Sequence, residues 1–260
     1  MAEVKAHQPG RFCWTELGTR DAASAKKFYG ELFGWTPIDV PIGPDAVYTM
    51  LQKNGKDVAA LYQLAKAQLS HGVPAHWLSY VAVDKVDEAA KKAKELGATM
   101  RSEPFDVMQA GRMAVLLDPT GAALALWQAG KHIGSALAGE SGSTCWTELW
   151  TANTGAAGTF YAALFDWQRD TTDMGGSPYT VFRSGEARVG GMTSLPSKGA
   201  EQLPHWLNYL AVDNCDDTAR RAKELGGQMA IVPTDIPTVG RFAVLSDREG
   251  ATFGVLQIAS

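Results

Sequence analysis

Apolar and polar positions follow two different periods along this chain, and the changes of period mark helices and strands. The spacing i, i+3, i+4, i+7 is followed by Ala25, Phe28, Tyr29 and Leu32, which predicts one apolar face of a helix. Asp21 precedes this helix as a candidate N-cap. A second helix is predicted between Val86 and Leu96. Short apolar runs predict strands over 11–17, 46–52, 57–64, 77–83, 112–118 and 122–128.

The whole pattern occurs twice. The segment 13–17, Cys-Trp-Thr-Glu-Leu, recurs as 145–149, and the segment from His76 to Tyr80 recurs with one change as His205 to Tyr209. Over 76–100 against 205–229, about 15 of roughly 25 positions are identical. The period, roughly 130 residues, is too long for a solenoid and indicates two copies of a whole domain.

A Gly- and Ser-rich stretch separates the copies and is typical of a linker. We therefore predict a first domain over 1–133, a linker over 134–142 and a second domain over 143–260. Each copy contains the order strand, helix and two or three strands twice over. The chain thus divides into four modules, at about 11–68, 76–130, 143–198 and 204–260.

Several local strings resemble the vicinal oxygen chelate superfamily, which includes glyoxalases, bleomycin-resistance proteins and extradiol dioxygenases. They are the helix from Asp21 to Trp35, the strand from Tyr80 to Asp84 and the turn from Asp118 to Gly121. The chain is most similar to bacterial tandem glyoxalase-like proteins. The resemblance implies an α+β fold in which four βαβββ modules pair into two glyoxalase-like domains. Each domain would have a curved, barrel-like mixed sheet around a cavity.

The resemblance also implies where a metal would be bound, and this chain departs from it there. The opening-strand ligand position falls on Trp14 and Trp146, the second-module position on Leu78 and Leu207, and the glutamate position on Ala125 and Gly254. The corresponding place near 59–61 is apolar too. None of these side chains supplies the nitrogen or oxygen that a divalent cation needs. We therefore expect no cofactor, with a divalent metal at a displaced site as the alternative.

Strand alternation selects the candidate polar residues of the cavity, because residues two apart share a face. If Trp14 and Leu78 point inward, so do Glu16, His76 and Tyr80. A carboxyl, an imidazole and a phenol can act as acid, base and hydrogen-bond donor. The candidate catalytic residues are therefore Glu16, His76 and Tyr80 with their repeats Glu148, His205 and Tyr209.

Trp14 and Trp146 could line the cavity and stack on a flat ligand. Arg112 and Arg241 could capture an anionic group. Each of these residues also has a purely structural alternative role. The glutamates could be paired with Arg112 and Arg241, since buried acids are usually paired. The arginines could pin loops, and the histidines could be satisfied by the backbone. Trp77 and Trp206 are expected to pack under helices.

Composition narrows the possible partners. The net charge of −4 gives no basic excess for nucleic acid. No apolar run approaches the roughly 18 residues of a membrane span, the first residues lack a signal core, and three cysteines form no disulfide framework. We expect a cytoplasmic protein that binds a small organic molecule, by sequestration or acid–base chemistry. The alternatives are a metal-dependent lyase, isomerase or dioxygenase, and a protein in which one copy binds while the other is structural.

Overall fold

The computed structural model describes residues 3–44, 46–173, 177–195 and 203–259. The first copy forms an eight-stranded sheet in the order β2-β3-β4-β1-β5-β8-β7-β6. Because β1 is parallel to β4 and antiparallel to β5, the sheet is mixed and the two modules join at its centre. Its strands are β1 (Phe12–Thr19), β2 (Thr36–Gly43), β3 (Ala46–Lys53), β4 (Lys56–Gln63), β5 (His76–Ala82), β6 (Thr99–Val107), β7 (Gly111–Leu117) and β8 (Ala123–Ala129).

The second copy forms a second sheet with the same order, β10-β11-β12-β9-β13-β16-β15-β14. Its strands are β9 (Thr144–Thr151), β10 (Gln168–Asp173), β11 (Pro178–Ser184), β12 (Ala187–Ser194), β13 (His205–Ala211), β14 (Gln228–Ile236), β15 (Gly240–Ser246) and β16 (Thr252–Ile258). The two tandem domains that the repeat predicts, and the α+β glyoxalase-like fold that the resemblance implies, are confirmed.

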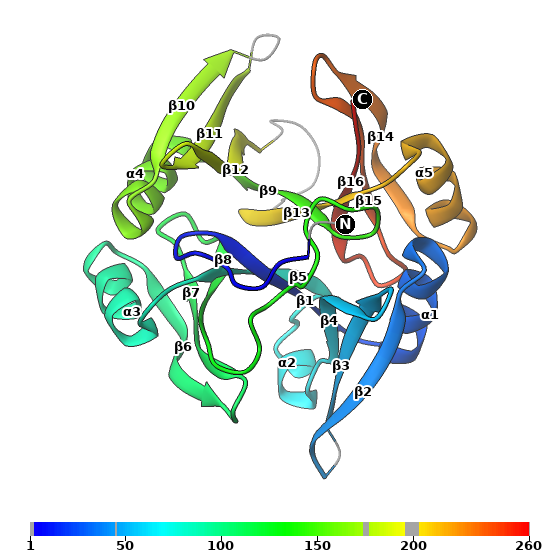
Figure 1. Cartoon of the computed structure of the whole chain (residues 1–260), viewed down its shortest axis with the longest axis horizontal. Helices are drawn as coiled ribbons and strands as arrows, with labels where there is room; N and C mark the ends of the chain where they lie inside the picture. The colour runs from blue at the N-terminus through cyan, green and yellow to red at the C-terminus, as the bar shows by residue number, and fades with distance from the viewer. Residues whose placement is uncertain (1–2, 45, 174–176, 196–202, 260) are drawn as a thin grey trace.

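The two sheets pack with their convex faces toward each other (Figure 1). The helices α1 (Ala22–Phe33) and α5 (Cys215–Glu224) lie together on one side of this interface, and α3 (Val86–Glu95) and α4 (Thr154–Phe165) lie on the other. Each pair combines one helix from each domain. Among the described residues, no helix is both long and apolar enough to cross a membrane.

Local chemistry explains where the helices begin and end. The Asp21 carboxylate accepts a hydrogen bond from the Ser24 amide at 2.9 Å, as predicted for the N-cap of α1. Gly34 ends α1 in the left-handed conformation with φ of 67°. On the apolar face of α1, the Tyr29 hydroxyl accepts from Trp77 Nε1 at 3.1 Å. Trp206 donates to Tyr161 of α4 in the same way, at 2.8 Å. Both tryptophans therefore pack under helices, as predicted.

Four edge or near-edge elements were not among the predicted strands. They are β2, β6, β10 and β14, which carry few buried side chains. An edge strand has only one neighbour and buries little surface, so its sequence lacks the apolar run that marks a central strand. The short helix α2 (Lys66–Ser70), which has no buried residue, was missed for the same reason.

Candidate functional site

The concave face of each sheet carries one polar cluster on an otherwise apolar floor. We call the concave face of the first sheet, with Trp14, Glu16, Leu78 and Tyr80 as its floor, the first cup. The corresponding face of the second sheet, with Trp146, Glu148, Leu207 and Tyr209, is the second cup. Cross-strand pairing places Trp14 opposite Tyr80 and Glu16 opposite Leu78, so the predicted alternation is what brings these side chains to one face.

In the first cup, a chain of hydrogen bonds ends on the Glu16 carboxyl group. Trp14 Nε1 donates to the Tyr48 hydroxyl at 3.1 Å, and that hydroxyl donates to Glu16 Oε2 at 2.8 Å. The Tyr80 hydroxyl lies near the same carboxyl group and lowers its pKa, and it donates to Met113 Sδ at 4.0 Å. The glutamate is only 8% exposed. No arginine takes part in this chain, so the alternative of a Glu16–arginine pair is wrong.

Burial sets the protonation of this cluster. Desolvation raises the pKa of Glu16, and the hydroxyl groups of Tyr80 and Tyr48 lower it by less. Burial and the nearby carboxylate raise the pKa values of Tyr48 and Tyr80 well above the ordinary range. Both phenols therefore stay neutral donors, while the carboxyl group is the member of the cluster that can exchange a proton.

The second cup repeats the cluster with one more donor. Glu148 accepts from the Tyr179 hydroxyl at 2.6 Å, from Tyr209 at 3.1 Å and from Trp150 Nε1 at 2.6 Å. Trp146 Nε1 donates to the Tyr179 hydroxyl at 2.9 Å. Desolvation also raises the pKa of Glu148, against these hydrogen bonds.

The floors of the two cups differ at two pairs of positions. Gly191 and Gly254 of the second cup replace Ala60 and Ala125 of the first. A Cβ atom on Gly191 would lie 2.0 Å from the Tyr179 hydroxyl, and one on Gly254 would lie 2.2 Å from the ring of Tyr209. The second-cup tyrosines therefore lie directly against the backbone of the sheet.

The histidines lie farther along the same strands. His76 pairs with Gly18, and His205 pairs with Trp150, so each is two positions beyond the residue opposite the glutamate. Each Nδ1 atom bonds to a backbone carbonyl at 2.8 Å, which belongs to Pro74 or Leu203. In both His76 and His205, the backbone therefore satisfies one ring nitrogen, which agrees with the alternative of a structural role. Burial lowers the pKa of His205, which favours the neutral imidazole there.

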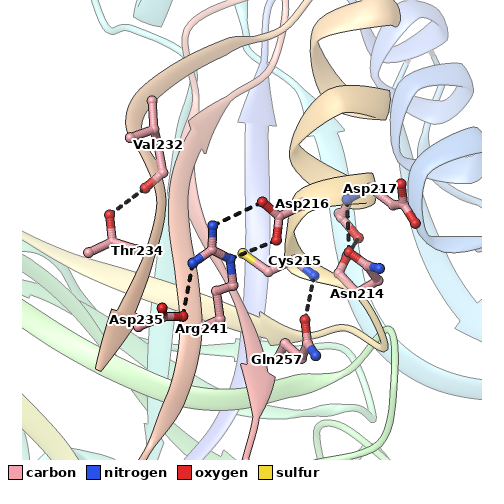
Figure 2. A network of polar contacts seen from close by, with 10 residues as sticks. Asn214, Cys215, Asp216, Asp217, Val232, Thr234, Asp235, Arg241 and Gln257 are labelled. Atoms are coloured by element: carbon pink, nitrogen blue, oxygen red, sulfur yellow. Dashed lines mark hydrogen bonds and ion pairs between the residues drawn. The ribbon is translucent and has the colours of Figure 1, made fainter. Parts of the chain in front are cut away.

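Arg112 and Arg241 lie on the opposite faces of their sheets. Arg241 bonds through Nε and Nη2 to both oxygens of Asp216 in α5, at 2.6 and 3.0 Å, and through Nη1 to Asp235 at 2.9 Å (Figure 2). Arg112 holds Asp87 of α3 and Asp106 in the same way. The expected contact of these arginines with a ligand in the cavity is therefore wrong. Strand alternation turns them toward the helices, which they pin to the sheet.

Tyr48, Tyr179 and Trp150 are members of the clusters that the sequence analysis did not single out. A signal was present for the two tyrosines, because the dipeptide Tyr-Thr occurs at 48–49 and again at 179–180, with nearly the same spacing as the other repeated segments. No such repeat marks Trp150, whose counterpart in the first copy is Gly18.

Comparison with known proteins agrees with this architecture. A sequence profile of the Glyoxalase/Bleomycin resistance protein/Dioxygenase superfamily matches residues 11–126 and 145–255. The chain belongs to this superfamily. A relative from Mycobacterium tuberculosis, named "Putative glyoxylase CFP32", is 42% identical over 100% of this chain and 99% of its own. "Anthracycline biosynthesis protein DnrV" of Streptomyces peucetius is 38% identical, over 96% of this chain and 94% of its own.

Solved structures of the superfamily share the fold at low identity. The Mn(II)-bound glyoxalase from Novosphingobium aromaticivorans has a TM-score of 0.65 at 18% identity, over 96% of this chain and 82% of that one. The 2,3-dioxygenase LapB from Pseudomonas sp. KL28 has a TM-score of 0.63 at 12% identity, over 96% and 92%.

The positions that the resemblance assigns to metal ligands are apolar in both cups. Trp14, Leu78 and Ala125 belong to one hydrophobic cluster of the first cup. Trp146 and Leu207 belong to the corresponding cluster of the second. In the part of the chain that the structure describes, no three His, Cys, Asp or Glu side chains come together in a way that could hold a metal ion. The residues present do not fit the superfamily's metal.

Proposed function

We propose that this protein binds a small, flat organic molecule in one or both cups and that it does so without the metal of its superfamily. The observation that carries the proposal is a buried carboxyl group next to two tyrosines on a concave face. Glu16 with Tyr48 and Tyr80 forms this arrangement in the first cup. Fully buried acids without a cationic partner are rare in protein cores, so a repeated example supports a role beyond packing.

The raised pKa of Glu16 suits it to exchange a hydrogen bond or a proton with an oxygen atom of a ligand. A protonated carboxyl donates to a carbonyl oxygen, and an ionised one accepts from a hydroxyl group. Sequestration requires only this contact. Acid–base chemistry would use the same carboxyl group to transfer a proton at that atom.

Aromatic side chains around the carboxyl group support a flat ligand. Tyr48, which accepts a hydrogen bond from Trp14, and its cross-strand partner Tyr62 are half-buried on the floor of the first cup, and such rings stack on planar molecules. Two relatives at 38% and 37% identity are named anthracycline biosynthesis proteins. Anthracyclines contain fused flat rings that carry carbonyl and hydroxyl oxygens, which is the chemistry that the cup would recognise.

The alternative is a glyoxalase-like lyase, isomerase or dioxygenase with a displaced metal site. The Mn(II)-bound glyoxalase among the structural neighbours supports it. The carboxyl of Glu16 and the free ring nitrogen of His76 are the donors that such a site could use. They are fewer than the three or four protein ligands that a metal site usually has.

The test is a titration of the full chain with 1,8-dihydroxyanthraquinone, after dialysis against a chelator and measurement of metal content by mass spectrometry. We expect binding without metal, and weaker binding by at least about 10-fold in Glu16→Gln or in Glu148→Gln, because the amide replaces one carboxyl oxygen by an NH2 donor and cannot exchange a proton with the ligand. Glu95→Gln is the control, since Glu95 is exposed on α3 and makes only a 4.0 Å contact with Lys91. Stoichiometric metal that survives dialysis and is required for binding would establish the alternative. Unchanged affinity in both site variants would refute the role of the carboxyl groups.

A further inference from the structure

The outer walls of the first cup are apolar and exposed. Ile38 and Val40 of β2 lie opposite Met50 and Tyr48 of β3, so they share the face that carries Tyr48 and the Glu16 cluster. They are 44% and 38% exposed. On the opposite arm, Phe105 of β6 lies opposite Met113 and is 44% exposed. Exposed apolar residues that converge on a concave surface mark a binding site.

The intervening residue of β2 confirms which side these walls face. Asp39 bonds to Lys26 of α1 at 2.6 Å, and Thr49 donates to the same carboxylate at 2.6 Å. The side of β2 that carries Asp39 therefore faces α1, and the side that carries Ile38 and Val40 faces away from the helix, into the cup. The two arms of the first sheet, β2–β3 and β6–β7, are seen at the bottom of Figure 1 on either side of the cup.

The second cup has polar residues at the same three positions. Asp170 lies opposite Val181 and Thr172 lies opposite Tyr179, in the register of Ile38 and Val40. Thr234 lies opposite Phe242, where the first cup has Phe105. The floors of the two cups share the glutamate, two tyrosines and a tryptophan, whereas their walls differ in polarity.

The segment that follows β8, just before the linker, adds to this difference on one side of the first cup. The ring of His132 packs edge-on against Trp14 with 4.6 Å between ring centroids, and Trp14 is 7% exposed. Its counterpart Trp146 is half-buried. The first cup thus has an extra end wall, the ring of His132, which covers Trp14 and reduces contact between water and the floor.

We propose that the first cup is the site for a flat apolar ligand and that Ile38, Val40 and Phe105 determine this specificity. The polar walls of the second cup disfavour such a ligand, because Thr172 and the ion pair of Asp170 with Arg183, 3.6 Å long, would lose water on its binding and gain no hydrogen bond in return. This inference rests on the proposed function, to which it adds the domain and the chemical class of the ligand.

The experiment exchanges the walls between the cups. The double variant Ile38→Asp with Val40→Thr gives the first cup the residues of the second, on an exposed edge strand where folding can be checked by circular dichroism. Phe105→Thr changes the other arm independently. The matched control is Asp170→Ile with Thr172→Val in the second domain. The probe is 1,8-dihydroxyanthraquinone, and both affinity and stoichiometry are measured by quenching of tryptophan fluorescence and by calorimetry.

We expect the wild-type protein to bind one probe molecule per chain at the first cup, with a higher affinity than any binding at the second cup. The two first-cup variants should each bind it at least about 10-fold more weakly, since apolar contacts in a pocket are worth factors of this size. The control should retain the wild-type affinity at the first cup. Two equivalent sites per chain, or first-cup variants that bind as wild type does, would overturn the inference while leaving the proposed function intact. No binding by the wild-type chain would overturn both.

Discussion

Gly254 lies under the ring of Tyr209, and its replacement by alanine tests how closely the second cup is packed. The new Cβ atom would lie 2.2, 2.5 and 2.6 Å from three ring carbons of Tyr209. Carbon atoms in contact are about 3.5–4.0 Å apart, so the ring must retreat by roughly 1 Å. The Tyr209 hydroxyl is already 3.1 Å from Glu148, and this shift breaks the hydrogen bond.

The expected change in the free energy of unfolding combines three effects. Overpacking a buried site costs about 1–3 kcal/mol, and losing the tyrosine hydrogen bond costs about 1 kcal/mol more. The alanine restores about 0.5 kcal/mol by restricting the unfolded chain. The net destabilisation is therefore about 1.5–3.5 kcal/mol, which for a chain of this size corresponds to a Tm lower by roughly 3–14 °C.

The assay is thermal and urea unfolding of Gly254→Ala followed by fluorescence. Gly155→Ala is the matched control, because Gly155 is exposed in α4 and the nearest atom to its new Cβ would be 3.6 Å away. This control should be neutral or slightly stabilising. A Gly254→Ala protein as stable as the control would show that the Tyr209 ring does not lie against the strand.

Three further results are expected from the same structure. Because the pKa values of Glu16 and Glu148 are raised on folding from a starting value of 4.5, the native state binds more protons than the unfolded state above that pH. The unfolding free energy should fall from pH 4.5 through the folded pKa, by at most about 1.4 kcal/mol per pH unit for each group. Stability curves of Glu16→Gln with Glu148→Gln should lack this component. Tyr29→Phe removes a buried hydrogen bond to Asp247 of the other domain, 3.0 Å long, and should lower the unfolding free energy by about 1–3 kcal/mol in urea. Arg241→Ala should leave 1,8-dihydroxyanthraquinone affinity unchanged in a titration, because its side chain faces α5; a loss of affinity in this variant would contradict the placement.

Much of the fold follows from the sequence because central elements bury one face completely. The Asp21 cap, the face of α1 and the strand that carries Trp14 and Glu16 all have strong local signals, repeated in both copies. The outer strands have no such signal. All eight residues of β2 are exposed, so their partners in the sheet and not their own periodicity determine their conformation.

The candidate site could be predicted only in part, for a similar reason. Alternation along β1 and β5 correctly brought Glu16 and Tyr80 to one face. It could not show that Tyr48, from a strand joined through β4, would supply the donor to Glu16. For Arg112 and Arg241, the glycine before each arginine indicated the start of a strand, but it did not show toward which face of the sheet the side chain points. Pairing with Asp87 and Asp216, which begin helices distant in sequence, is a tertiary contact.

The exchange of large and small residues between the cups explains how one floor can support different walls. Gly18 lies opposite Tyr62 in the first cup, whereas Trp150 lies opposite Thr193 in the second. A Cβ atom on Gly18 would meet Tyr62, Leu64 and His76 at 3.0–3.1 Å, so the first cup has no space there for the indole that the second contains. Side chains therefore fill this space in both cups. Only in the second cup does the side chain that fills it, Trp150, donate a hydrogen bond to the glutamate. Since interiors tolerate exchanges that keep total volume, the two sites could acquire different electrostatics with little change in the packing of the sheet. Glu16, the glutamate with fewer hydrogen-bond donors, lies in the cup with apolar walls. A hydrogen bond with an oxygen atom of a ligand would therefore stabilise it more than Glu148.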